Sequence, residues 1–410
     1  PVTSTTSKQS SKKKRRTPAT TRKSLLLMKV KRNTLATQLS VLILFLCLIG
    51  TAMVMSASSV ESLNEGSGAY AFVTKHLMNL TFGAVVFWLI SRFDYRRWLG
   101  LGPILLIGAV AMLIAVLIPG LGITHSGARR WLGAGPLEFQ PSEAVKFPLA
   151  IVLAGLLSAR EKAGELRSIR RTLLPVGLMT ISIAFLVVVE PDFDSTLVIL
   201  GLVAGLLLLV GIPKTWLLGA AVGGAALTYY ELSEPFRRAR MFVFVDPWKD
   251  ALGTGYQSIA GYTSLALGGW FGAGPGASTA KWGFLPVAYS DFVFAVIGEE
   301  FGVAGCLVVV CCFVAFGVIG FKIALRAPDR FGTLLAAGLT LTVLLQAVIN
   351  IGMVVGIVPV SGLTLPFISY GGTSLVLMLS AAGILCNIAY QGRPRVVSTK
   401  ATPKAKLSRG

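Results

Sequence analysis

Long apolar segments separated by short polar ones fill most of the chain between positions 36 and 392. A run of about 18 or more mostly apolar residues is long enough to cross a bilayer of about 30 Å as a helix. Such a helix satisfies its own backbone hydrogen bonds and needs no soluble-type core. The pattern therefore predicts an all-α polytopic membrane protein with ten transmembrane helices. Their expected positions are 36–57, 76–92, 100–119, 141–159, 172–190, 195–212, 214–232, 292–320, 333–354 and 368–390.

Basic residues gather in three short loops, at 91–98, 160–171 and 322–330, and in the tail after Gly392. Lys and Arg accumulate in the cytoplasmic loops of membrane proteins. With an even number of helices, both termini are therefore predicted to be cytoplasmic. The large loop 233–291, between helices seven and eight, is then extracytoplasmic. Its stretch "GYTSLALGGWFGAGPGAS" favours a loop that folds back on the protein, because long loops in compact domains are usually functional.

Composition divides the chain into three parts. Of its residues 54% are hydrophobic and 14% are charged, the mean hydropathy is +0.73, and the net charge is +20. Residues 1–32 contain many Lys and Arg and no acid. We expect a disordered basic cytoplasmic tail at 1–35, a transmembrane domain at 36–392 and a second basic cytoplasmic tail at 393–410. The tail can also contact anionic lipid headgroups. A nucleic-acid partner is not expected, since no folded basic domain accompanies the tail.

Cysteines and histidines suggest no metal site at the sequence level. The five cysteines all lie within apolar runs without metal-ligand spacing, which is typical of small buried hydrophobes. His76 and His125 have no neighbouring metal ligands in the sequence, and we interpret both as surface or loop residues.

A first polar cluster spans 125–146, "HSGARRWLGAGPLEFQPSEAVK". Its Gly-rich loop carries Arg130 and Trp131, and the opening of the next helix carries Glu143 and Lys146. Residues three apart share a face of a helix, so this acid and this base can pair. Two interpretations stay open: an ion pair that pins the end of the helix, and a polar wall of a pocket.

Two further clusters place carboxylates within or beside apolar runs. In "EPDFDS" (190–195), both aspartates are functional candidates, and the alternative, an extracytoplasmic turn exposed to water, carries more weight for Asp194 than for Asp192. In "LPVAYSDFVFAVIGEE" (285–300), Asp291 stands where the chain enters a helix, so it is either a helix cap or a functional acid. Glu299 and Glu300 lie about two turns deeper. We expect them to pair with basic groups or to line a cavity.

The fourth cluster is "PVSGLTLPFISYGGTS" (359–374). Its prolines, glycines and hydroxyls indicate irregular backbone, which at membrane depth is tolerated only inside protein or beside a water-filled cavity. Such backbone can offer N–H groups to an anion.

Together, these clusters resemble the SEDS family (shape, elongation, division and sporulation proteins). The matching blocks are "GARRWL", "FQPSE..K", "PDF", "LP....DF.FAVIGEE.G" and "NIG...G..P..GLTLPFISYGG.S", in the family's order and over nearly all of 35–392. "GGWFGAGPGAS" and "KWGFLP" are more similar to the division members (FtsW type) than to the elongation members (RodA type). The sequence departs from the family at Tyr289-Ser290, where His-Thr is usual, and at Asp194-Ser195, where Gly-Thr is usual.

The resemblance implies a ten-helix glycosyltransferase of the cytoplasmic (inner) membrane that polymerises lipid II into glycan strands on its outer side, at the division septum. The implied partners are a class B penicillin-binding protein (FtsI type) and small proteins of the FtsQ, FtsL and FtsB type. Three alternatives remain: a lipid II flippase, a RodA-type elongation polymerase, and a scaffold without activity. Because the special segments gather on the predicted outer side, chemistry there is favoured.

The reaction joins a sugar hydroxyl to an anomeric carbon and expels a diphosphate, so one carboxylate base plus positive charge suffices. Asp291 is the candidate base, with inversion at the anomeric carbon. Arg130 is the candidate for the diphosphate, with Arg129 and Lys281 in reserve. No cofactor is certain. A divalent cation, Mg or Mn, held by carboxylates such as Asp291 or Asp192, could serve instead of the arginine.

The remaining candidates shape the substrate cavity. Trp131 offers a flat face to a sugar or prenyl unit, or else anchors the protein at the membrane interface. Glu299 and Glu300 would be structural residues or would report partner binding to the cavity. The full set of predicted substrate-binding residues is Arg130, Trp131, Glu143, Lys146, Asp192, Lys281, Ser369, Tyr370, Gly371 and Gly372.

Overall fold

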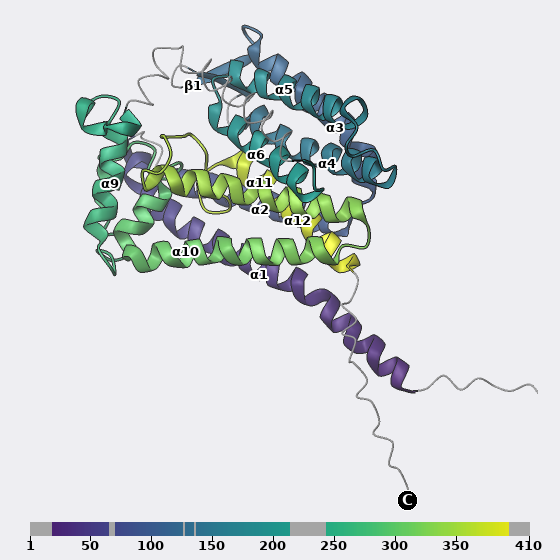
Figure 1. Cartoon of the computed structure of the whole chain (residues 1–410). Coiled ribbons are helices and arrows are strands. Elements are labelled where there is room, and N and C mark those ends of the chain that lie inside the picture. Colours follow the sequence, from purple (N-terminus) through teal and green to yellow (C-terminus); the bar gives the residue numbers. More distant parts are fainter. Residues whose placement is uncertain (1–18, 65–69, 126–127, 135–136, 214–242, 393–410) are drawn as a thin grey trace, which may run out of the picture.

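The chain forms a mainly helical bundle whose long helices run side by side (Figure 1). The computed structural model describes residues 19–64, 70–125, 128–134, 137–213 and 243–392. The helical elements are α1 (Ala19–Asn64), α2 (Ala71–Arg92), α3 (Arg97–Leu117), α4 (Pro141–Lys162), η1 (Ile169–Leu173), α5 (Leu174–Val189), α6 (Phe193–Leu209), η2 (Pro247–Asp250), α9 (Tyr256–Gly268), η3 (Ala280–Trp282), α10 (Val293–Arg326), α11 (Arg330–Val354) and α12 (Gly372–Gln391).

The prediction of a polytopic membrane protein agrees with the helices. Within the described residues, eight helices are long and apolar enough to cross a membrane, and α6 is a shorter apolar helix. The predicted seventh helix, 214–232, lies outside the described residues, so the number ten stays a prediction. So do the two basic tails, which fall largely on positions whose side chains are not described.

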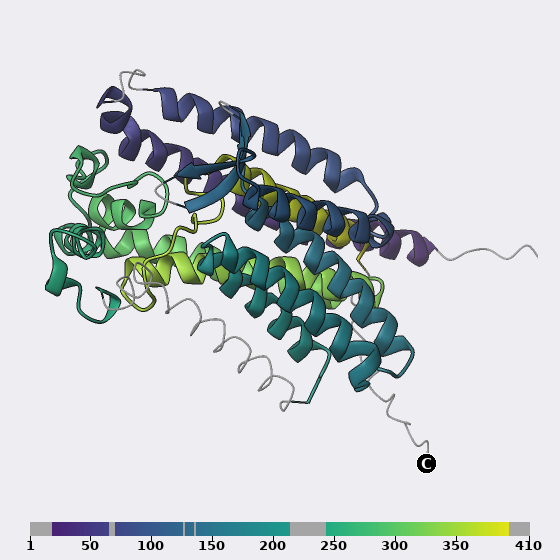
Figure 2. The same ribbon diagram turned by 90° about the horizontal axis from the view of Figure 1, so that it is seen from above.

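Burial separates central helices from peripheral ones. Of the spanning segments of α4, α11 and α12, 72%, 67% and 72% are buried, against 17% for α2 and 28% for α3. The α11 helix packs against α4, α6 and α10, and α12 packs against α2 (Figure 2). Polar side chains on α4 and α11 are therefore enclosed by protein, where intramembrane polar groups can be satisfied.

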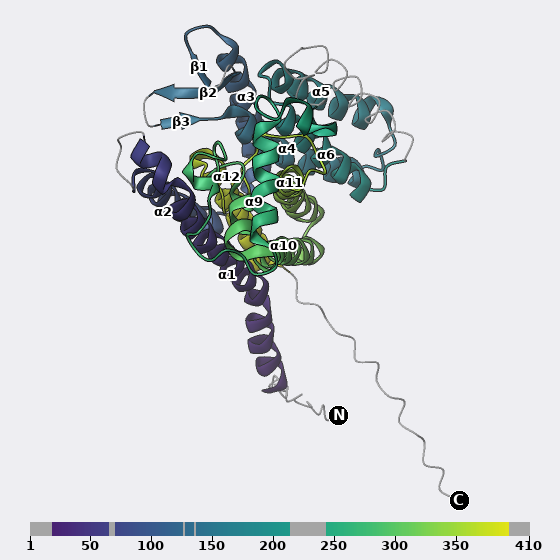
Figure 3. The same ribbon diagram turned by 90° about the vertical axis from the view of Figure 1, so that its left-hand side faces the viewer.

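One part of the fold differs from the all-α expectation. The predicted loop 120–140 contains a three-stranded antiparallel sheet, in the order β1 (Gly122–His125), β2 (Ala128–Ala134) and β3 (Leu137–Phe139). Segments this short cannot satisfy their backbone groups as helices, and pairing with neighbouring strands does so instead. Figure 3 looks onto the end of the bundle where this sheet and α9 lie.

The basic loops meet at one end of the bundle. Arg96 Nε lies 3.1 Å from Asp329 Oδ2, and Arg96 Nη1 donates to Gln391 Oε1 at 2.7 Å. Arg330 Nε lies 2.6 Å from Glu161 Oε2. The loops before α3, after α4 and before α11 are thus joined to the end of α12. This gathering is what the sequence predicts of loops on one side of a membrane, and their cytoplasmic location stays a prediction.

The large loop folds back onto α10, which is broken at Gly302 (φ 66°, ψ −165°). Segment 269–274 forms hydrogen bonds with the backbone groups of α10 on both sides of the break. The amides of residues 273 and 274 donate to the carbonyls of Glu299 and Glu300 at 2.9 and 3.0 Å. In return, the amides of residues 303 and 304 donate to the carbonyls of residues 269 and 270 at 2.9 and 3.2 Å. The break sets the first part of α10, which begins just after Asp291, apart from the long remainder.

The structure corrects two minor expectations. His76 is not a surface residue: it is 1% exposed, on α2, and its ring lies 6.3 Å from the ring of Tyr370. Of the cysteines, Cys47, Cys312 and Cys386 are buried as expected, but Cys306 is only partly buried and Cys311 is exposed on α10. An apolar run alone does not distinguish a face that meets other helices from a face that meets lipid.

Candidate active site

Asp291 lies in the segment that leads into α10, and Phe292, not Asp291, is the N-cap of that helix. The Ser290 hydroxyl donates to Asp291 Oδ1 at 2.9 Å. The Asp291 backbone carbonyl accepts from Asn350 Nδ2 at 2.8 Å, and the same amide nitrogen donates to the Leu363 carbonyl at 2.6 Å. Asn350 is fully buried. One side chain of α11 thus ties Asp291 to the 359–371 loop, and helix capping does not account for the acid.

The motif before α12 holds the other side of the Asp291 segment. Ser369 Oγ donates to the Ser290 carbonyl at 2.6 Å, and the Tyr370 amide donates to the Tyr289 carbonyl at 3.0 Å. The ring of Tyr289, at the position of the first departure, also lies 5.5 Å from the ring of Tyr370 and 4.8 Å from that of Phe72. The predicted site residues Ser369 and Tyr370 therefore position the backbone next to Asp291.

The two glycines of this motif are places of close approach. A methyl group on Gly371 would lie 2.9 Å from Thr364 Cγ2, and one on Gly372 would lie 2.8 Å from Asn79 Nδ2. Glycine fits at both positions because it has no Cβ. Like their neighbours, Gly371 and Gly372 contribute packing close to the Asp291 segment.

Arg130 comes from β2 and faces the same glycine as Asp291. A methyl group built on Gly362 would lie 3.8 Å from Arg130 Nη1 and 4.0 Å from Asp291 Oδ2. Arg130 Nη2 also donates to the Pro191 carbonyl. The sheet, the 359–371 loop and the entrance of α10 thus bring a guanidinium and a carboxylate close to one glycine, and the roles predicted for the two residues stay predictions.

Arg130 interrupts the pairing of β2 with β1: Trp131 pairs with Ile123 and Arg129 with Thr124, so Arg130 is the extra residue of a β-bulge, which redirects side chains locally. Arg129 Nη1 donates to the Leu117 carbonyl at the end of α3, at 3.3 Å. Trp131 is half-buried and pairs with Ile123 of β1. Arg129 thus has an anchoring contact at the end of α3, and the substrate role predicted for Trp131 stays a prediction.

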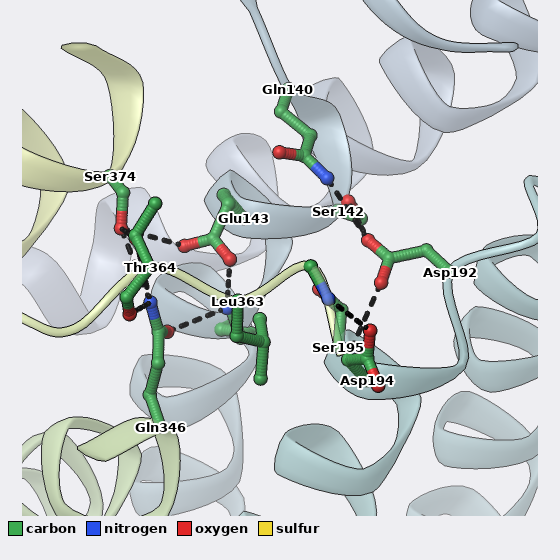
Figure 4. Close-up of polar contacts among 12 residues, drawn as sticks. Gln140, Ser142, Glu143, Asp192, Asp194, Ser195, Gln346, Leu363, Thr364 and Ser374 are labelled. Atoms are coloured by element: carbon green, nitrogen blue, oxygen red, sulfur yellow. Dashed lines mark hydrogen bonds and ion pairs between the residues drawn. The ribbon is translucent and has the colours of Figure 1, made fainter. Parts of the chain in front are cut away.

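Asp192 is the N-cap of α6, and three donors reach its carboxylate (Figure 4). Oδ1 accepts from the Ser195 amide at 3.1 Å, and Oδ2 accepts from Ser142 Oγ at 2.6 Å and from Gln140 Nε2 at 3.1 Å. Burial alone would raise the pKa of Asp192, but the charge of Arg130 and these hydrogen bonds lower it below its ordinary value. Asp192 is therefore a charged residue that joins α6 to the start of α4.

The second departure from the family, Asp194, also has a defined contact. Its Oδ2 accepts from the Gly362 amide at 2.9 Å. The extra acid therefore holds the loop glycine that both Arg130 and Asp291 face.

Glu143 and Lys146 form a fully enclosed ion pair (Figure 4 shows its partners). Lys146 Nζ lies 2.7 Å from Glu143 Oε1, and the lysine side chain is 0% exposed. Lys146 also donates to Gln346 Oε1 at 3.0 Å, and Ser374 Oγ donates to Glu143 Oε2 at 3.3 Å. Gln346 Nε2 donates in turn to the Thr364 carbonyl at 3.1 Å. The pair connects α4, α11, α12 and the 359–371 loop beneath the site.

The remaining predicted residues bind their own loop. Lys281 Nζ donates to the Gly276 carbonyl. Glu299, expected to pair with a basic group, instead accepts from Ser278 Oγ at 2.6 Å, from the amide and hydroxyl of Thr279 at 2.7 and 2.6 Å, and from the Ala280 amide at 3.3 Å. Glu300 accepts from the hydroxyl of Ser56 on α1. Among the described residues, neutral donors therefore stand where basic partners were one of two expectations, and the other expectation, that these glutamates line a cavity, stays a prediction.

Carboxylates near the site do not form a ready-made metal centre. Within the part of the chain that the structure describes, no three His, Cys, Asp or Glu residues are grouped so that they could hold an ion. Asp192 is already surrounded by protein donors. These residues therefore do not fit the predicted divalent site as they stand.

Sequence reasoning did not single out three buried polar residues: Glu190, Gln346 and Asn350. Gln346 and Asn350 are four apart in an otherwise apolar helix, so they share a face. A pair of amides at this spacing inside a spanning run is a signal that could have identified both.

Comparison with known proteins agrees with the motifs. A family model described as "Cell cycle protein", for FtsW, RodA and SpoVE, matches residues 37–393. Stage V sporulation protein E of Bacillus subtilis (strain 168) is 34% identical over 368 residues, 89% of this chain and 100% of that protein. The probable peptidoglycan glycosyltransferase FtsW of Pseudomonas fluorescens (strain SBW25) is 38% identical over 355 residues, 85% of this chain and 86% of that protein.

Solved structures share the architecture. One chain, from work on the structural coordination of polymerization and crosslinking by a peptidoglycan synthase complex, matches with a TM-score of 0.69 and 29% identity, covering 86% of this chain and 96% of that one. The rod shape determining protein RodA of Thermus thermophilus matches with a TM-score of 0.63 and 27% identity, covering 87% of this chain and 97% of that one. This chain therefore belongs to the FtsW, RodA and SpoVE family, the SEDS family that its motifs predict.

Proposed function

We propose that this protein is a peptidoglycan glycosyltransferase that polymerises lipid II into glycan strands, with Asp291 as general base. The observation that carries the proposal is the approach of Arg130 Nη1 and Asp291 Oδ2 to one point, 3.8 and 4.0 Å from a methyl group built on Gly362. Relatives named as peptidoglycan glycosyltransferases support the reaction class.

In the proposed reaction, the 4-hydroxyl of one sugar attacks the anomeric carbon of another. The Asp291 carboxylate takes the hydroxyl proton as the new C–O bond forms. The bond from the anomeric carbon to the diphosphate breaks, and its electron pair stays on the diphosphate oxygen. A single displacement of this kind inverts the anomeric centre.

Arg130 would stabilise the charge that develops on the departing diphosphate, because its planar guanidinium matches phosphate oxygens. Its bond to the Pro191 carbonyl and its place on a paired strand hold it near that position before substrate arrives. No step is assigned to a metal ion. A requirement for Mg or Mn is a separate prediction, tested by adding a chelator to the polymerisation assay.

The proposed setting is the outer face of the cytoplasmic membrane, at the division septum. The similarity to a chain of a complex that combines polymerization and crosslinking supports a crosslinking partner of the class B penicillin-binding type. FtsW-named relatives support the division role over the RodA-type elongation role, and partners of the FtsQ, FtsL and FtsB type follow from it.

The test is polymerisation of purified lipid II by the protein co-purified with its crosslinking partner, the transpeptidase being inactivated. Wild type is expected to form strands, and Asp291→Asn is expected to lose at least about 100-fold in rate, as for removal of a general base. Asp250→Asn, an exposed acid of the same loop that accepts from Thr254, is the matched control and is expected to retain the rate.

Equal strands from wild type and Asp291→Asn would remove the proposed base while leaving the enzyme. If neither forms strands, but the preparation moves lipid II across vesicle membranes, the flippase alternative replaces the polymerase.

A further inference from the structure

Glu190 is the buried acid that the proposed reaction does not use. It lies in the turn between α5 and α6, outside both helices, and is 0% exposed. Both of its carboxylate oxygens are buried, and neither has a hydrogen-bond partner among the residues that the structure describes. An ionised carboxylate in such a place is strongly unfavourable, because water has been removed and no donor replaces it.

The charged groups around Glu190 make its lack of hydrogen-bond donors more unusual. Arg130, from β2, and Asp192, of the same turn, are the charges that act on its carboxyl, and Lys146 on α4 acts on Asp192. Arg130 donates to the carbonyl of the next residue, Pro191, rather than to the Glu190 carboxyl. Arg130 Nε is itself buried and has no partner in the described part of the chain. A buried acid and a partly buried guanidinium thus act on one another, and no hydrogen bond or ion pair between them is found within the described ranges.

A neutral Glu190 explains this arrangement. Burial, and to a smaller extent the negative charge of Asp192, raise the pKa of Glu190 to about 9 against the opposing positive charge of Arg130. A protonated carboxyl does not attract the guanidinium strongly, whereas a buried carboxylate would.

We propose that Glu190 is a positioning residue that is kept as a neutral carboxylic acid, so that the guanidinium of Arg130 is left for an anionic group of the substrate. Asp192, which three donors stabilise as an anion, carries the fixed negative charge of the turn. Ionisation of Glu190 would add a second negative charge beside Arg130 and bind it. The substrate would then meet an already neutralised arginine.

The inference rests on the proposed function, in that Arg130 is taken to meet a diphosphate. The experiment therefore has one arm that needs no activity. Apparent unfolding temperatures of the detergent-solubilised wild type and Glu190→Gln are measured from pH 5 to pH 9. In this range the unfolded chain releases the Glu190 proton and the folded protein keeps it, so wild-type stability falls as the pH rises. Glutamine cannot ionise, so the advantage of Glu190→Gln is expected to grow with pH.

The activity arm compares, within each protein, the rate of lipid II polymerisation at pH 10 with that at pH 7.5. One pH unit above its pKa a group is ionised about ten to one, so the wild-type rate is expected to fall about tenfold. Glu190→Gln is expected to fall less than about twofold. Asp250→Asn, whose acid titrates far below this range, is expected to follow the wild type.

Parallel falls in wild type and Glu190→Gln, or a difference in unfolding temperature that is constant with pH, would overturn the proposal. Activity that survives in Asp291→Asn would contradict the proposed base alone, because the unfolding measurement on Glu190 does not depend on it.

Discussion

Two buried glutamates of this protein have opposite surroundings. Glu299, on the first part of α10, accepts from two hydroxyls and two backbone amides of residues 278–280. Glu190, between α5 and α6, accepts from no group that the structure describes. Both are almost completely enclosed, at 1% and 0% exposure. Burial alone therefore does not reveal what a carboxylate does, and the donors around it separate the two.

The difference shows that buried carboxyl groups near one site can have different roles. A carboxylate surrounded by donors from one loop fixes that loop, and here the loop leads to Asp291. A carboxyl without donors beside Arg130 contributes no structural bond, so its presence points to control of charge. The Glu143–Lys146 pair is a third arrangement, in which a buried base satisfies the acid.

The largest expected effect comes from removing the partner of a paired acid. Lys146→Met would leave Glu143 buried beside no cation and is expected to destabilise the protein by about 3–5 kcal/mol. The double variant Glu143→Gln with Lys146→Met should recover part of this loss. Unfolding in detergent measures both. Unchanged stability with lost polymerisation would instead make Lys146 a substrate contact.

A smaller loss is expected for Glu299→Gln. Each oxygen accepts from a backbone amide, so the new NH₂ group must face one of these N–H groups whichever way the side chain turns. We expect a loss of about 2–3 kcal/mol in unfolding free energy, with lower polymerisation because the loop before Asp291 loosens. Glu190→Gln is the matched variant. A similar loss of unfolding free energy in the two variants would contradict the difference proposed between the two glutamates.

Gly362→Ala is expected to have the smallest effect on stability. It is also expected to lower activity, for a different reason. Its nearest contacts, at 3.8 and 4.0 Å, are ordinary ones, so the unfolding free energy should change by less than about 1 kcal/mol. The methyl group would occupy the space between Arg130 and Asp291, and the polymerisation rate is expected to fall at least about tenfold. Gly268→Ala is the steric control, since its methyl would overlap the Gly298 carbonyl oxygen and should destabilise the fold. A normal rate in Gly362→Ala would place the substrate elsewhere.

Hydrophobic pattern predicted the long helices well because each one is specified by its own apolar length. Asp291 and Arg130 were named as site candidates from their motifs, but 161 positions separate them in the sequence, so their approach to Gly362 could not be read from it. The sheet at 122–139 was missed, because three short strands in a Gly-rich loop have little period of their own. Partners of buried acids were the least predictable part. Neutral donors such as Ser278 and Thr279 carry no charge signal in the sequence.

The break at Gly302 has a consequence for how the protein opens. The amides of Val303 and Ala304 donate to the carbonyls of residues 269 and 270. The amides of residues 273 and 274 donate to the carbonyls of Glu299 and Glu300, before the break. In a hydrogen-exchange experiment these four amides should therefore exchange at similar rates, as one cooperative unit, although some 30 positions separate them along the chain. Solvent that reaches this unit would loosen the start of α10, which directly follows Asp291, so the lifetime of the arrangement around Asp291 would be set by a loop and not by the bundle.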